Sequence, residues 1–225
     1  MASLGRPLFL LNLKTYPGAL GSGAERFGRL LEETGKELGV AVAIAPAAPD
    51  LGRLASALSI PVIAQHVDAI GAGAHTGSVP PEAVAQVGGW GSLVNHSEHP
   101  IPEPLAAETV RRLRTLSLIA VVCARDVSAA RRLATSTPPY LAVEPPELIG
   151  GDRSVSTARP AVVSGSVDAV RKVSPSTIVL CGAGIHERHD VARALELGAE
   201  GVLVASAVVR APDPRESLRE LLGGF

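Results

Sequence analysis

Eight short apolar runs recur along the 225 residues, and this repetition limits the folds open to the chain more than any other feature. The runs show little alternation between apolar and polar residues, which is typical of parallel strands covered on both faces. Antiparallel hairpins would instead alternate with a period of two. The expected strands span residues 8–13, 40–45, 61–65, 92–95, 118–123, 140–143, 177–181 and 201–205.

Segments with helical spacing separate these runs. Three apolar helix faces are predicted: Phe27, Leu30, Leu31, Thr34 and Leu38; Leu105, Thr109, Val110, Leu113 and Leu116; and Val191, Ala194, Leu195 and Gly198. Ser22 with Glu25 predicts a capping box, and Gly39 and Gly198 stand where helices are expected to end. The expected strand starts are on average roughly 28 residues apart, which is enough for one strand–helix unit each.

Eight such units without a Pro-, Gly- or Ser-rich linker predict a closed (β/α)8 barrel, a single α/β domain over residues 1–225. An open Rossmann-like sheet is the main alternative. Residues 182–187 read Gly-Ala-Gly-Ile-His-Glu and lack the third glycine of the dinucleotide fingerprint. No Gly-x-x-x-x-Gly-Lys-Ser/Thr loop occurs either, so nucleotide binding has no support in the sequence.

Charge and hydropathy narrow the classes of partner. The chain has 21 basic and 22 acidic residues, so it lacks the strong charge of nucleic-acid binders and membrane-surface proteins. No apolar run approaches the 18 residues of a membrane span, and the run at residues 8–11 is too short for a signal peptide. We therefore expect a cytoplasmic protein with a small-molecule ligand and neither a nucleic-acid nor a membrane partner.

The cysteines, aromatic residues and paired histidines predict a core that contains neither a disulfide nor a metal site. Cys123 and Cys181 lie in apolar stretches without Cys-x-x-Cys spacing, which favours buried free thiols over a disulfide or a zinc site. Trp90 and the three phenylalanines are expected to fill the core. His186 and His189 stand at a helical i, i+3 spacing, but no third metal ligand accompanies them, so zinc is not expected.

Polar or glycine-containing segments follow five of the expected strands at their carboxyl ends, which is where (β/α)8 barrels have their active sites. These ends are Asn12-Leu13-Lys14 after the first run, Asn95-His96-Ser97-Glu98 after the fourth, Glu144-Pro145-Pro146 after the sixth, Gly182-Ala183-Gly184 after the seventh, and Ala205-Ser206 after the eighth. They supply a cation, an imidazole, a carboxylate and two turns of a size to bind phosphate. The phosphate turns alone would fit many barrel enzymes.

In order and spacing these five motifs resemble those of triosephosphate isomerases, specifically the short archaeal form, over essentially the whole chain. The family pattern reads Asn-x-Lys, Asn-His-Ser-Glu, Glu-Pro-Pro-Glu-Leu-Ile-Gly, Cys-Gly-Ala-Gly-Ile and Leu-x-Ala-Ser. It matches residues 12–14, 95–98, 144–150, 181–185 and 203–206. The resemblance implies an aldose–ketose isomerase of glycolysis and gluconeogenesis that interconverts D-glyceraldehyde 3-phosphate and dihydroxyacetone phosphate. It also implies no metal or organic cofactor, and a homo-oligomer that is usually a tetramer.

The resemblance assigns roles to four polar residues. Glu144 is the base for the carbon-bound proton, His96 the electrophile, and Lys14 the electrostatic stabiliser, with Glu98 supporting the cluster through Lys14. The residues themselves agree with this. Lys14 is one of three lysines among 21 basic residues. Glu144 follows an apolar strand and precedes two prolines, so it is expected in a water-poor position that favours a carboxylate as a carbon base.

Substrate contacts and a lid complete the expected site. The expected substrate-binding residues are Asn12, Leu13, Lys14, Ile149, Gly150, Gly184, Ala205 and Ser206. Residues 145–152 resemble the family's closing lid, which excludes water from the enediolate.

Three positions depart from the family pattern: Asp152 near the far hinge of the lid, Ala207 after the last phosphate loop, and His99 after Glu98. Two alternatives therefore stay open. One is another phosphate-binding barrel enzyme, and the other is a non-catalytic sugar-phosphate sensor.

Overall fold

The computed structural model describes residues 3–148 and 154–225, and it confirms the eight predicted strands. The strands are β1 (Leu8–Asn12), β2 (Ala41–Ala45), β3 (Ile63–Ala64), β4 (Gly91–Val94), β5 (Ile119–Ala124), β6 (Tyr140–Val143), β7 (Ile178–Gly182) and β8 (Gly201–Val204). Seven agree with the prediction within one residue at either end. The exception, β3, is shorter than expected because only two of its residues pair with β4.

The strands form one parallel sheet in the order β2-β1-β8-β7-β6-β5-β4-β3. The two outer strands of this order are joined by a bridge between Ile44 and Val62, and the Ile44 N–H donates to the Pro61 carbonyl at 3.0 Å. The sheet therefore curves round into a nearly closed barrel, as predicted. A central β1 that pairs with both β2 and β8 excludes the open Rossmann-like order.

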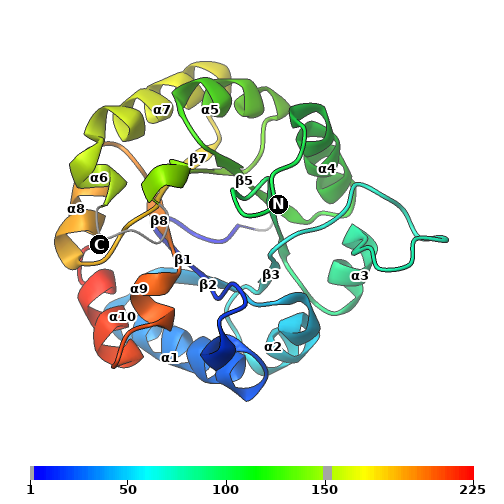
Figure 1. Cartoon of the computed structure of the whole chain (residues 1–225), viewed down its shortest axis with the longest axis horizontal. Coiled ribbons are helices and arrows are strands. Elements are labelled where there is room, and N and C mark those ends of the chain that lie inside the picture. Colours follow the sequence, from blue (N-terminus) through cyan, green and yellow to red (C-terminus); the bar gives the residue numbers. More distant parts are fainter. Residues whose placement is uncertain (1–2, 149–153) are drawn as a thin grey trace.

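Helices surround the strands (Figure 1). The α-helices are α1 (Ser22–Leu38), α2 (Leu51–Ala57), α3 (Pro81–Gln86), α4 (Glu103–Thr115), α5 (Val127–Leu133), α6 (Val155–Ala158), α7 (Pro160–Val173), α8 (Arg188–Glu196), α9 (Ser206–Val209) and α10 (Pro214–Leu222). Short 3-10 helices lie at η1 (Pro17–Ala19), η2 (Ala48–Asp50), η3 (Ala134–Ser136) and η4 (Pro146–Leu148). The connection from β3 to α3 extends away from the ring (Figure 1). Within the described ranges, no helix has the length and apolar character required to cross a membrane.

The helix ends confirm two predictions and correct a third. Gly39 ends α1 with a left-handed backbone (φ 70°), and Gly198 follows α8 with φ 92°. The predicted capping box of Ser22 with Glu25 was wrong, because α1 begins at Ser22 itself and has no side-chain cap. The preceding Gly21 N–H donates instead to the Asp50 carboxylate at 2.8 Å. The capping box that the structure contains pairs Glu187 with Asp190 at the start of α8.

Three residues predicted to be buried are exposed instead. Leu38, Leu105 and Trp90 keep 42%, 42% and 39% of their surface exposed. Leu38 is the last residue of α1, Leu105 lies in the first turn of α4, and Trp90 immediately precedes β4. At these element ends the packed layer between helices and barrel stops, so apolar spacing alone overestimates burial there.

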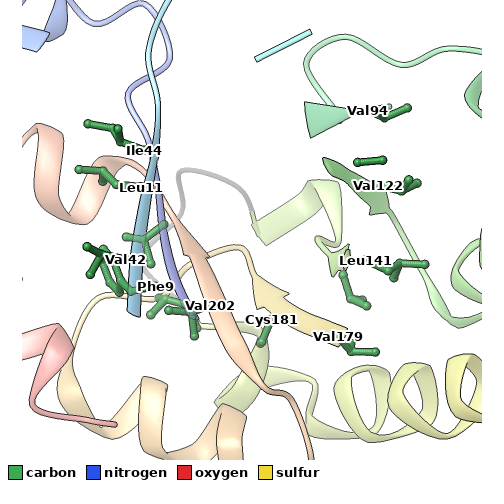
Figure 2. Packing of buried hydrophobic residues seen from close by; sticks show 14 of the residues in the cluster. Phe9, Leu11, Val42, Ile44, Val94, Val122, Leu141, Val179, Cys181 and Val202 are labelled. Carbon is green, nitrogen blue, oxygen red and sulfur yellow. The ribbon is translucent and has the colours of Figure 1, made fainter. Parts of the chain in front are cut away.

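Side chains alternate between two apolar clusters along each strand. Leu8 and Leu10 of β1 belong to a cluster inside the barrel, whereas Phe9 and Leu11 belong to a larger cluster between the strands and the helices. Figure 2 shows members of the outer cluster contributed by neighbouring strands. Because successive side chains of a strand point to opposite faces, Asn12 at the end of β1 continues the inward row.

Candidate active site

The carboxyl ends of the strands surround a small cavity. Its lining consists of Asn12, Lys14, His96, Glu144, Ala183, Gly184, Ile185, Leu203, Val204, Ala205 and Ser206. Among the described residues that line it, Lys14 is the one cation and Glu144 the one carboxylate. The strand ends that were far apart in sequence therefore meet at one mouth of the barrel, as the sequence predicted.

The alternation along the strands aims two of these side chains at the cavity. In β6, Tyr140 and Ala142 face the barrel interior while Leu141 and Val143 face the helices, so Glu144 is the next inward position. In β1 the same alternation turns Asn12 inward and the following residue outward. This explains why Leu13, an expected substrate contact, lies in the outer cluster and does not line the cavity.

Lys14 is held by its backbone as well as by its ammonium group. Its N–H donates to the Asn12 side-chain oxygen at 3.0 Å, and its carbonyl accepts from the Gln65 amide at 3.0 Å. The ammonium donates to a Glu98 carboxylate oxygen at 2.7 Å. Only 13% of the Lys14 side chain is exposed, against 55% for Glu98, so the ion pair reaches from the cavity wall to solvent. Glu98 itself does not line the cavity, but it contacts two residues that do, Lys14 and His96.

His96 is buried, and its hydrogen bonding defines its tautomer. The Nδ1 atom accepts a hydrogen bond from the Glu98 backbone N–H at 3.2 Å. A nitrogen that accepts carries no proton, so the neutral ring has its N–H at Nε2. This Nε2 atom lies 3.6 Å from a carboxylate oxygen of Glu144. The imidazole therefore presents a donor to the same space that the carboxylate faces.

The Glu144 side chain is buried, and one of its two carboxylate oxygens accepts no hydrogen bond from the described residues. It is 6% exposed, and its backbone N–H donates to the Ala124 carbonyl at 2.8 Å. Its Oε2 atom has no hydrogen-bond partner among the described residues. Burial, together with the neighbouring Glu144 carboxylate, raises the pKa of the Cys123 thiol well above its usual range, so this thiol stays protonated beside the carboxylate. Cys123 and Cys181 are both buried free thiols, as predicted.

The ends of β7 and β8, which lie between β6 and β1 in the strand order, contribute backbone to the cavity wall. Ala183 and Gly184, which follow β7, both have positive φ, 77° and 69°. Ala205 directly follows β8, and α9 begins at the next residue, Ser206. The first amides of a helix have no acceptor within it, so this wall offers N–H groups suited to an anion. Ala207, one of the departures from the family pattern, lies within α9, where its carbonyl accepts from the Ser217 hydroxyl at 2.8 Å.

Strained backbone gathers at the same mouth. Five non-glycine residues in the described part of the chain have positive φ, and three of them, Lys14, Asn95 and Ala183, follow β1, β4 and β7. Such conformations cost on the order of 1–3 kcal/mol each and persist where surrounding contacts enforce them. The Asn95 side chain supplies such contacts, since its oxygen accepts from the Ile101 N–H and its amide donates to the Cys123 carbonyl, both at 3.0 Å.

The remaining residues singled out in the sequence lie outside the cavity or outside the described part of the chain. Ile149, Gly150 and Asp152 fall in the part of the chain that the structure does not describe. The prediction that His186 and His189 share a helix face was wrong, because α8 begins only at Arg188. His99, another departure, packs against His66 in a tilted arrangement, with ring centroids 4.0 Å apart and an interplanar angle of 43°. Within residues 3–148 and 154–225, no group of three or more His, Cys, Asp or Glu side chains is placed to hold a metal ion.

Sequence reasoning missed several residues that shape the cavity. Ile185, Leu203 and Val204 line it, and all three belong to the strand 7 and strand 8 motifs, so extending the expected contacts across each motif would have found them. Gln65 also donates to the carbonyls of Lys14 and Ala45 at 3.0 Å each. It ends the third apolar run, and the same rule of reading strand ends would have identified it.

An ammonium, an imidazole N–H and a buried carboxylate around one small cavity can move a proton at a carbon next to an oxygen. A carboxylate so placed can accept the proton, while an imidazole and an ammonium can stabilise negative charge that develops on oxygen.

Comparison with known proteins agrees with this chemistry. The sequence model of the family described as triosephosphate isomerase matches residues 7–221. A triosephosphate isomerase of Methanothermus fervidus is 44% identical over 219 residues, covering 97% of this chain and 99% of that protein. One of Methanoculleus marisnigri is 45% identical over 216 residues, covering 96% and 97%. One of Methanothermobacter thermautotrophicus is 44% identical over 216 residues, covering 96% and 94%.

Proposed function

The chain belongs to the triosephosphate isomerase family, whose members are isomerases, and from that premise we propose that it interconverts D-glyceraldehyde 3-phosphate and dihydroxyacetone phosphate. The observation that carries the proposed mechanism is the Glu144 carboxylate, with one oxygen unpartnered among the described residues and 3.6 Å from His96 Nε2. A buried acceptor without a donor is costly unless a ligand uses it.

In this mechanism Glu144 removes a proton from the substrate carbon next to the carbonyl. The carbon–hydrogen electron pair becomes the carbon–carbon double bond of an enediolate, and negative charge develops on the carbonyl oxygen. Glu144 then returns the proton to the neighbouring carbon. The former carbonyl oxygen takes a proton from His96 Nε2, and the hydroxyl proton of the oxygen that becomes the new carbonyl returns to this nitrogen, which completes the exchange of aldose and ketose without net loss or gain of atoms.

His96 and Lys14 act on the oxygens. The Nε2–H of His96 donates to the enediolate oxygens, and the Lys14 ammonium stabilises their charge. Glu98 is a positioning residue in this scheme, since its carboxylate holds the ammonium and its backbone N–H holds the His96 tautomer. Asn12 acts alongside it by fixing the backbone of Lys14.

The substrate phosphate binds at the backbone wall formed by Gly184, Ala205 and Ser206, at the ends of β7 and β8. The family motif adds Ile149 and Gly150 as expected contacts from the lid. The proposed working form is a homo-oligomer in the cytoplasm, with the tetramer of the short archaeal form as the expected assembly. Light scattering coupled to gel filtration tests the assembly directly.

A coupled assay with D-glyceraldehyde 3-phosphate tests the function, using the wild type and Glu144→Gln. Removal of a general base costs about 10²–10⁴-fold in rate, so the variant should retain its fold and lose kcat by that factor. Wild-type turnover that Glu144→Gln leaves intact would refute the assigned base. Tight phosphate binding without any wild-type turnover would instead indicate a sugar-phosphate sensor, and turnover of a different phosphorylated substrate would indicate another barrel enzyme.

A further inference from the structure

Gly182, the last residue of β7, lies beside Glu144, which follows the neighbouring strand β6. The register pairs Val143 of β6 with Cys181 of β7, so the next positions on the two strands are Glu144 and Gly182. Both continue the inward rows of their strands, because Ala142 and Leu180 face the barrel interior. A Cβ atom at Gly182 would lie 2.6 Å from the Glu144 Cγ, 3.0 Å from Oε1 and 3.1 Å from the carboxylate carbon.

The backbone of Gly182 does not itself require glycine. Its φ lies outside the left-handed region, in contrast to the neighbouring Gly184 at 69°. The strand conformation would therefore accept any L-residue, and the space that a side chain would need is occupied by Glu144. Contacts below about 3.0 Å are far inside the van der Waals separation of two carbon atoms.

From this geometry we infer that Gly182 is a positioning residue that sets where the Glu144 carboxylate rests. The inference depends on the proposed function, since it assigns Gly182 a role in the proton transfer that Glu144 performs. The missing side chain leaves the space on the β7 side that the Glu144 side chain fills. On the β5 side the Cys123 thiol contacts the same carboxylate. With a methyl group at residue 182, the Glu144 side chain has to move toward that thiol and away from β7.

The expected consequence is a loss in kcat with binding preserved. A displacement of the reacting group by about 1 Å costs on the order of 10²-fold in rate. Gly182→Ala should therefore lower kcat by about that factor. KM should change by no more than about twofold, because the phosphate wall is untouched.

The experiment compares the wild type, Gly182→Ala and Gly18→Ala in the coupled assay, with inhibition by inorganic phosphate as a measure of the phosphate wall. Gly18 is the matched control, since a Cβ there meets nothing within 4 Å and its φ is not left-handed. The inference predicts that only Gly182→Ala loses kcat and that all three proteins respond equally to phosphate. It is overturned if Gly182→Ala keeps its kcat, or if Gly18→Ala loses as much.

Thermal unfolding provides a second test that does not need activity. Glu144→Ala removes the atoms that a methyl group at 182 would meet. Gly182→Ala should therefore lower Tm in the wild-type background and leave it nearly unchanged in the Glu144→Ala background. Equal losses in both backgrounds would overturn the inference. Absence of turnover in the wild type would refute the proposed function instead, while the unfolding comparison would still report whether the two residues are in contact.

Discussion

Strand β6 places one inward-facing polar side chain at each mouth of the barrel, and the two ends treat these side chains differently. At the amino end, the Tyr140 hydroxyl accepts from the Leu4 N–H at 2.9 Å and lies 3.2 Å from the Gly5 carbonyl, to which it donates. At the carboxyl end, Glu144 is similarly buried but keeps one oxygen without a partner among the described residues. Three residues of strand separate the two.

This difference in hydrogen bonding between Tyr140 and Glu144 indicates that the amino mouth serves stability and the carboxyl mouth serves ligand binding. A buried polar group whose hydrogen bonds are satisfied contributes stability, and Tyr140 uses its bonds to hold the N-terminal segment against the end of the barrel. A buried acceptor left open costs free energy in the empty protein and becomes useful only when a ligand occupies it. Changes at the carboxyl mouth should therefore act on catalysis, and changes at the amino mouth on stability.

The largest effect is expected at the carboxyl mouth. Lys14→Met removes the cation that we propose stabilises the developing oxyanion, so kcat/KM should fall by about 10²–10³-fold. Tm should move by only a few degrees. The coupled assay and thermal unfolding measure both. Lys36→Met is the matched control, because Lys36 is exposed near the end of α1, and it should leave kcat/KM unchanged. Equal losses from the two variants would contradict the contrast between the mouths.

At the amino mouth the balance should reverse. Tyr140→Phe leaves the Leu4 N–H and the Gly5 carbonyl without the hydroxyl, which should lower the free energy of unfolding by about 1–3 kcal/mol. Its kcat should stay at the wild-type value, and urea unfolding with the coupled assay measures the two quantities. Tyr16→Phe serves as control, since no hydrogen bond of the Tyr16 hydroxyl to another described residue is found. A large loss of kcat in Tyr140→Phe would show that the two mouths are coupled.

The smallest effect concerns a carboxylate that follows β2 and, unlike Glu144, is fully partnered. Burial acts to raise the pKa of Asp50, but hydrogen bonds from the Arg53 side chain and the Gly21 N–H bring it below its usual 3.8. Such a group contributes stability above the unfolded pKa, and the contribution is lost as pH falls through the folded pKa. Asp50→Asn should therefore cost about 1 kcal/mol at pH 7 and less at acid pH.

Urea unfolding of the wild type and Asp50→Asn, at pH 7 and at pH values lowered stepwise past the folded pKa, which lies below 3.8, measures that difference. The expected result is that the two proteins converge in stability at the acid pH. A difference that persists or grows there would mean that the ionised carboxylate is not the stabilising form.

The residues show where sequence reasoning succeeds. The meeting of Glu144, His96 and Lys14 at one cavity could be predicted, because a polar residue directly after a buried run marks the end of a strand and strand ends meet at one mouth of a barrel. Leu13 was expected among the substrate contacts because of its place within a motif, but the strand alternation turns its side chain toward the helices and away from the cavity. The predicted burial of Trp90 was wrong, because a residue at the end of a strand is buried only where another element packs over it.

The eight-unit barrel could be predicted from the amino-acid sequence, because run length, helical spacing and strand-end polarity are local patterns. Contacts between side chains from different strands could not be predicted in the same way. The 2.7 Å pair of Lys14 and Glu98 and the 3.6 Å approach of His96 to Glu144 join segments far apart in sequence. The fit of Glu144 against Gly182 depends on the register of β6 with β7. Register and barrel closure are set by packing over the whole core, so no local pattern encodes such distances.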